Sequence, residues 1–92
     1  MNLLNKLYKQ ASEYGVSKAD LTNEHYGERN VTMVRRMISV ILYNETSLPF
    51  KTICKAVGYK EHTTVLEHVR RYRKDINFRG DVSNFHAGAI LG

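Results

Sequence analysis

Apolar residues near the start of the chain recur with the 3.6-residue period of a helix, at Leu3, Leu4, Leu7, Tyr8 and Ala11. This spacing predicts a helix over residues 2–14, which Gly15 would end. Ser17 and the acid three residues later, Asp20, are typical of a helix N-cap. They predict a short second helix over residues 18–26.

The clearest helical period lies in the middle of the chain, at Val34, Met37, Ile38, Ile41 and Leu42. Asn30 precedes this period at a place suited to an N-cap, so the pattern predicts a helix that begins there. A polar turn follows over residues 44–47. Pro49 suits the first turn of the next helix, where its missing N–H is harmless, and we expect that helix over residues 48–57.

A turn and a new helical period follow. Gly58 interrupts the pattern, and the next period predicts a helix over residues 61–75 with an inward face made of Val65, Leu66, Val69, Tyr72 and Ile76. Two helices joined by a short turn with glycine form a helix-turn-helix. Asp81 is suited to cap a weak last helix that Gly88 interrupts. Because no strand pattern is found, we predict an all-α fold, a small helical bundle.

The length of 92 residues predicts a single domain over residues 1–92. It would comprise an N-terminal helical segment (1–27), a helix-turn-helix core (30–79) and a weak C-terminal helix or tail (80–92). Residues 29–79 hold eleven Lys or Arg against four acids, whereas the flanking segments hold three against five. Positive charge concentrated on the helix-turn-helix predicts a polyanionic partner.

The turn and the start of the following helix read Gly58-Tyr59-Lys60-Glu61-His62-Thr63-Thr64-Val65-Leu66. This run resembles the DNA-binding domain of the bacterial chromosomal replication initiator DnaA, whose hallmark reads roughly Gly-Gly-Arg-Asp-His-Thr-Thr-Val-Leu before a basic helix. The resemblance extends from Arg35-Arg36-Met37 to Arg70-Arg71, about half the chain, and Asp81-Val82-Ser83-Asn84-Phe85 echoes the closing helix of that domain. It implies a helix-turn-helix that binds double-stranded DNA.

The polar side of the motif helix carries the residues expected to meet DNA, namely Thr63, Thr64, Glu67, Arg70, Arg71 and Lys74. A threonine presents a hydroxyl to base edges and a methyl group to thymine, so we expect Thr63 and Thr64 to read bases, although both are also suited to cap the helix. The resemblance adds Glu61 and His62 as base readers. Glu61 replaces the family's aspartate and could instead stabilise the helix N-terminus, and His62 could be a half-buried structural residue.

Phosphate contacts are expected from seven cations: Arg35, Arg36, Lys51, Lys55, Lys60, Arg70 and Arg71. The first two align with the family's phosphate-contacting pair, and for any one of these cations a solvated surface position is the alternative. The resemblance also implies an arginine in the minor groove. In that region only His25, Arg29 and Asn30 are candidates, so we assign Arg29 to this role.

Other kinds of chemistry find little support in the sequence. No Gly-rich phosphate loop and no paired metal-ligand spacing is present, so we expect no ATPase module, no metal, no cofactor, no small-molecule substrate and no enzymatic activity. Cys54 is the single cysteine and occupies an apolar helical position, which predicts a buried thiol. Without a membrane-spanning run or a secretory signal, we expect a cytoplasmic, nucleoid-associated protein.

Three functions fit these features. The first is a stand-alone, sequence-specific DNA-binding protein that regulates replication initiation or transcription and that a phage or mobile element could encode. The second is a phage DNA-packaging or assembly subunit that binds DNA largely without sequence preference and associates with itself through the N-terminal helix. The third is a protein-interaction module in which the N-terminal apolar stripe docks on a protein partner and the basic surface contacts an acidic protein, although the stripe could instead complete the domain's own core.

Overall fold

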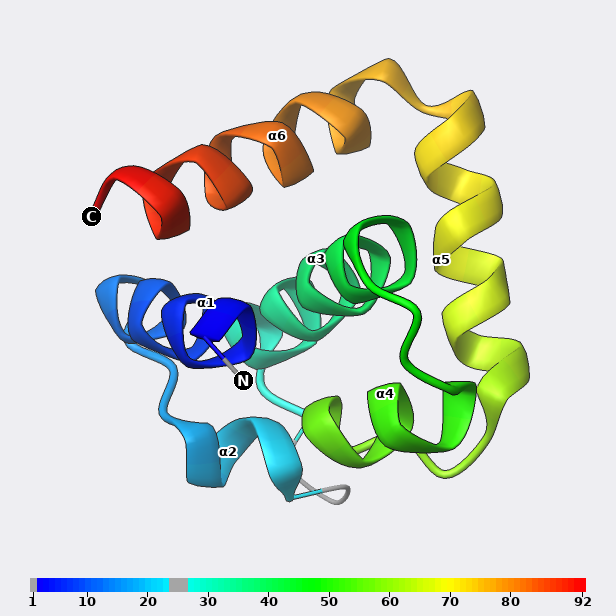
Figure 1. Ribbon diagram of the computed structural model, residues 1–92, viewed down its shortest axis with the longest axis horizontal. Helices are drawn as coiled ribbons and strands as arrows, with labels where there is room; N and C mark the ends of the chain where they lie inside the picture. The colour runs from blue at the N-terminus through cyan, green and yellow to red at the C-terminus, as the bar shows by residue number, and fades with distance from the viewer. Residues whose placement is uncertain (1, 24–26) are drawn as a thin grey trace.

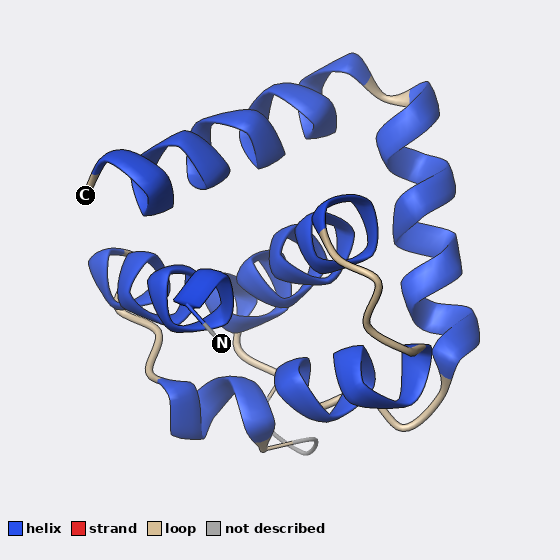
Figure 2. Cartoon of the chain, in the orientation of Figure 1, coloured by secondary structure: helices blue, strands red, loops and turns tan. Residues whose placement is uncertain are grey.

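Helices account for all the regular structure in the described part of the chain, residues 2–23 and 27–92 of this computed structural model (Figures 1 and 2). In chain order they are α1 (Asn2–Glu13), α2 (Lys18–Thr22), α3 (Arg29–Glu45), α4 (Phe50–Val57), α5 (His62–Lys74) and α6 (Ile76–Leu91). Short loops join them, and no strand occurs among these residues. The prediction of an all-α fold is confirmed.

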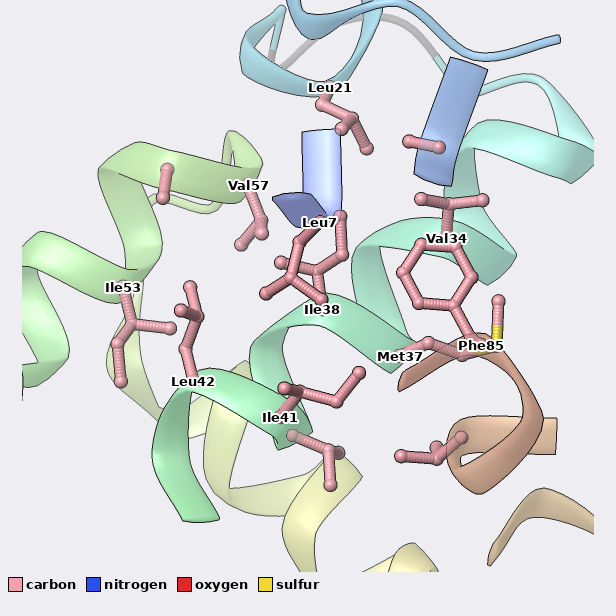
Figure 3. Close-up of a cluster of buried hydrophobic side chains, with 14 of the residues drawn as sticks. Leu7, Leu21, Val34, Met37, Ile38, Ile41, Leu42, Ile53, Val57 and Phe85 are labelled. Carbon is pink, nitrogen blue, oxygen red and sulfur yellow. The ribbon is translucent and has the colours of Figure 1, made fainter. Parts of the chain in front are cut away.

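Helix α3 lies at the centre of the bundle and contacts all five other helices. Its apolar side chains reach into a core shared with α1, α2, α4 and α6, as Figure 3 shows for Val34, Met37, Ile38, Ile41 and Leu42. Each of these side chains is at most 1% exposed. Burying one such side chain stabilises the fold by about 1.5–3 kcal/mol, so α3 is the main source of core stability.

The N-terminal apolar stripe is part of the same core. Leu7 and Ala11 are fully buried, and Figure 3 shows Leu7 pointing toward α3. The Tyr8 hydroxyl donates a hydrogen bond of 2.8 Å to the Ala56 carbonyl and so ties α1 to α4. Leu3, Leu4 and Tyr8 pack against this core but stay partly exposed, so docking of a partner on the stripe stays a prediction.

The starts of α2 and α3 differ in how well the sequence predicted them. The Ser17 hydroxyl and the Asp20 carboxylate form the expected capping box, but α2 ends at Thr22, and residues 24–26 of the prediction lie outside the described residues. The prediction that Asn30 caps α3 is wrong. Glu28 holds that position, and its carboxylate accepts the Asn30 backbone N–H at 3.2 Å.

The C-terminal region forms a longer helix than predicted. The Asp75 carboxylate caps α6 by accepting two backbone N–H groups, so the helix begins at Ile76 and Asp81 is an interior residue. The helix continues through both of its glycines because a regular stripe of apolar side chains is buried along it: Phe78, Val82, Phe85 and Ala89. Ile76, predicted to face inward, is 77% exposed.

The turn between α4 and α5 depends on Gly58. Its φ of 76° is left-handed, a conformation that side chains with a Cβ avoid, and its N–H donates to the Cys54 carbonyl at the end of α4. A Cβ at this position would collide with the Leu21 carbonyl oxygen of α2. Helix α4 begins at Phe50, so Pro49 is its N-cap and does not lie within the first turn, as was predicted for a helix over residues 48–57.

Replacing Gly58 with alanine should destabilise the protein more than the same change at Gly15. Both glycines have a φ of about 75°, but a Cβ at Gly15 would meet no atom within 4 Å. Gly15→Ala should therefore lower the free energy of unfolding by only the left-handed backbone term, about 1–2 kcal/mol. Gly58→Ala should lose this term and, in addition, the free energy needed to move the Leu21 carbonyl of α2 away from the new Cβ. Urea unfolding followed by circular dichroism measures both, and equal losses would contradict the close approach.

Candidate nucleic-acid interface

The first residues of α5 present polar side chains to solvent. Glu61, His62 and Thr63 are exposed, and Thr64 is half-buried. Neither threonine hydroxyl bonds to another described residue, and the Glu61 side chain makes no capping hydrogen bond although Glu61 holds the N-cap. Within the described structure these groups are therefore available to a ligand, and the capping role considered for the two threonines is not observed.

The rest of α5 has one buried and one exposed side. Val65 and Val69 are at most 3% exposed and pack into the core. About 100° of rotation per residue places the opposite stripe on four exposed side chains, those of Thr63, Glu67, Arg70 and Lys74. In Figure 1 this helix forms one edge of the molecule, so its outer stripe is not covered by another helix. The stripe, hereafter the α5 stripe, is polar along three turns.

His62 is both exposed and held in place. Its ring lies 5.7 Å, centroid to centroid, from the ring of Phe50 at the start of α4, and the Phe50 ring stacks at 5.7 Å on that of Tyr43. The His62 ring thus packs on an aromatic neighbour while the residue stays exposed, so the half-buried position considered for it is not observed. Its base contact stays a prediction. An exposed imidazole at the helix start is accessible to a ligand.

A surface pocket of about 390 Å³ adjoins His62, hereafter the α4–α5 pocket. Its lining combines aromatic rings, a thiol and cations: Phe50, Lys51, Cys54, Lys55, Tyr59, Lys60 and His62. All three lysines are exposed. Cys54 is the predicted buried thiol, 5% exposed, and burial raises its pKa. The lining carries three positive charges and no carboxylate, which favours an anion.

A second pocket, of about 370 Å³, lies where α3, α5 and α6 meet, hereafter the α3–α6 pocket. It is lined by Arg29, Thr32, Met33, Arg36, Arg71, Phe78 and Asp81. The Arg71 guanidinium lies 5.2 Å above the Phe78 ring, and its Nε is 3.5 Å from the Asp75 carboxylate. Three arginines against the single acid of the lining give this pocket net positive charge as well.

The two pockets meet α5 on opposite flanks. His62 lines one and Arg71 lines the other, and nine residues at about 100° each place their side chains about 180° apart around the helix axis. The same nine residues advance about 13.5 Å along the axis. The α5 stripe therefore runs between two cationic depressions.

A half-buried polar pair joins α5 to the turn that precedes it. The Tyr59 hydroxyl and His68 Nε2 are joined by a hydrogen bond of 2.9 Å. Burial raises the pKa of Tyr59 to about 12. Burial, reinforced by the nearby positive charges of Arg36 and Arg71, lowers the pKa of His68 to about 4, so both side chains are neutral at pH 7. This pair was not predicted, because Tyr59 and His68 are nine residues apart and no motif connects them.

Arg35 does not lie at this surface, and the structure corrects its predicted phosphate contact. The side chain is 6% exposed, and its guanidinium donates to the carbonyls of Leu21, at 3.0 Å, of Asp20, at 3.1 Å, and of Asn23. These carbonyls belong to the end of α2, where a helix leaves its last C=O groups without internal partners. Arg35 is thus a structural residue that fastens α2 to α3.

The other predicted cations are accessible. Arg36 is partly exposed, while Arg29, Lys51, Lys55, Lys60, Arg70 and Arg71 are exposed. Arg29 is the first residue of α3 and lines the α3–α6 pocket, and its predicted minor-groove contact stays a prediction. Arg70 lies on the α5 stripe itself. His25, which was considered with Arg29 for the minor-groove contact, lies outside the described residues.

The described residues contain no group of three or more His, Cys, Asp or Glu side chains able to hold a metal ion. Among the described helices none has the length and apolar character needed to span a membrane. Comparison of the chain with protein-family models, with curated proteins and with solved structures finds no match.

Replacing Arg35 with alanine should destabilise the fold by about 3 kcal/mol, because buried carbonyls at the end of α2 lose charged donors. Arg70→Ala is the matched control. Its side chain is exposed and should change the free energy of unfolding by no more than about 0.5 kcal/mol. Chemical denaturation measures both variants. An Arg35→Ala protein as stable as Arg70→Ala would show that the guanidinium does not hold α2.

Proposed function

We propose that this protein is a sequence-specific double-stranded DNA-binding protein that inserts α5 into the major groove, with α4 and α5 as its helix-turn-helix. The observation that carries this is the polar α5 stripe between two cationic pockets. A groove-bound helix needs this arrangement because it faces base edges in front and a phosphate backbone on either side.

The dimensions support this placement. The major groove is about 12 Å wide, and an α-helix with its side chains has a diameter of about 10–12 Å, so a helix that enters it brings both flanks close to phosphates. The α4–α5 pocket would receive one backbone through Lys51, Lys55 and Lys60. The α3–α6 pocket would receive the other through Arg36 and Arg71. These contacts supply affinity and register without reading sequence.

Base reading would come from the start of α5. Thr63 is exposed on the stripe and has the chemistry to bond a base edge and pack on a thymine methyl group. His62, held by Phe50, and the unpaired carboxylate of Glu61 flank it. Thr64 is half-buried, so its contribution would be the smaller of the two threonines.

The biological role proposed is regulation of replication initiation or transcription by a stand-alone DnaA-like helix-turn-helix, which a phage or mobile element could encode, acting at the nucleoid. Support comes from the resemblance of residues 58–66 to the motif of the initiator's DNA-binding domain. A packaging or assembly role would need the same cationic surface but no base preference. Sequence selectivity therefore separates the two roles.

Selection of bound duplexes from a random pool, followed by titration of the recovered site, tests this function. The wild-type protein should return a consensus and prefer it over scrambled duplex. Thr63→Ala should lose about 1–3 kcal/mol on that site and little on scrambled duplex, because it removes only a base contact. Arg36→Ala should weaken both duplexes alike and reduce the slope of log K against log salt by about one.

Lys9→Ala is the matched control for charge. Lys9 is exposed on α1, which makes no contact with α5, so its loss should leave the consensus unchanged and affect binding less than Arg36→Ala. Equal affinity of the wild-type protein for selected and scrambled duplex would favour the packaging role. Absence of binding to any duplex would refute DNA binding altogether.

A further inference from the structure

One acidic side chain of the α5 stripe makes no hydrogen bond or ion pair with the described residues. Glu67 follows Thr63 by four residues, about one turn or 6 Å along the axis, and is exposed on the same side of the helix. It forms no ion pair with any described residue, although Arg70 and Arg71 lie three and four positions later. Arg71 instead pairs with Asp75 at 3.5 Å, toward the C-terminal end of α5.

A carboxylate at position 67 weakens the binding of DNA without sequence preference. With cationic pockets holding the backbones on both flanks, the α5 stripe faces a polyanion, and an unpaired acid there is repelled by phosphates and by the acceptor edges of guanine and thymine. The interaction of this carboxylate with DNA is favourable only where a base presents a hydrogen-bond donor to it. In the major groove those donors are the N4 amino group of cytosine and the N6 amino group of adenine.

The spacing on the helix agrees with this role. Recognition helices of homeodomains contact bases from positions related as i, i+3, i+4 and i+7. Counting from Thr63, these positions are Leu66, Glu67 and Arg70. Leu66 is partly buried, which leaves Glu67 and Arg70 as the exposed members after the first turn.

We propose that Glu67 is a specificity-determining residue that accepts a hydrogen bond from a base amino group, with cytosine preferred, one helical turn beyond the contact of Thr63. This assignment rests on the proposed DNA-binding function. Cytosine is favoured over adenine because a carboxylate only accepts, whereas adenine also presents its N7 acceptor beside the amino group.

Random-pool selection with full-length wild type, Glu67→Gln, Glu67→Ala and the control Glu13→Gln tests the assignment. The wild-type consensus should contain a cytosine that is preferred about tenfold. Glu67→Gln should shift that one position toward adenine, since an amide can both donate to N7 and accept from the N6 amino group. Glu67→Ala should remove the preference there and leave the other positions unchanged.

Glu13→Gln makes the same change of charge at an exposed residue of α1 and should leave the consensus as in wild type. Circular dichroism should show all variants folded, because Glu67 makes no contact that folding needs. A clear wild-type consensus that Glu67→Gln and Glu67→Ala leave unaltered would overturn the assignment alone. A wild-type protein that returns no consensus would overturn both the assignment and the sequence-specific function on which it rests.

Discussion

The burial of α3 among five other helices determines where the charged residues of this chain can lie. A helix surrounded on nearly every side must either exclude ionic groups or satisfy them internally, because an unpaired buried charge is strongly unfavourable. Arg35 is satisfied by carbonyls at the end of α2, which fixes that short helix against the core. Gly58 then allows the turn before α5 to approach Leu21 closely. The direction of α5 therefore depends on the hydrogen bonds of Arg35 to α2 and on the absence of a Cβ at Gly58.

Once α5 is placed, the surface chemistry follows from helical geometry. Its inner side is fixed by Val65, Val69 and the neutral Tyr59–His68 pair, so its outer side has to be the polar one. Helices α3 and α4 supply cations beside α5 without covering its outer side. The buried core and the exposed polar surface of α5 are therefore two consequences of one packing arrangement.

The sequence predicted most helices because their apolar periods are regular and their caps local, as with the Ser17 capping box. It failed where a tertiary contact outweighed local preference. Helix α6 passes through Gly80 because buried aromatic rings on either side stabilise it more than glycine weakens it. Arg35 and Arg36 are adjacent and chemically identical, and only the packing of α2 shows which is internal. Helical periodicity correctly predicted the exposure of Thr63, Arg70 and Lys74 but not that Thr64 is half-buried. The two flanking pockets could not be predicted because they involve helices that are distant in the sequence.

Amide chemical-shift mapping on the ¹⁵N-labelled protein, titrated with its selected duplex, examines most directly whether α5 meets DNA between its two cationic flanks. The arrangement described here predicts that the largest saturable changes occur along α5, from His62 to Lys74, and extend to Lys51 and Lys55 on one side and to Arg36 on the other. Helix α1 should change little. Changes centred on α1, or spread evenly over the whole surface, would contradict it.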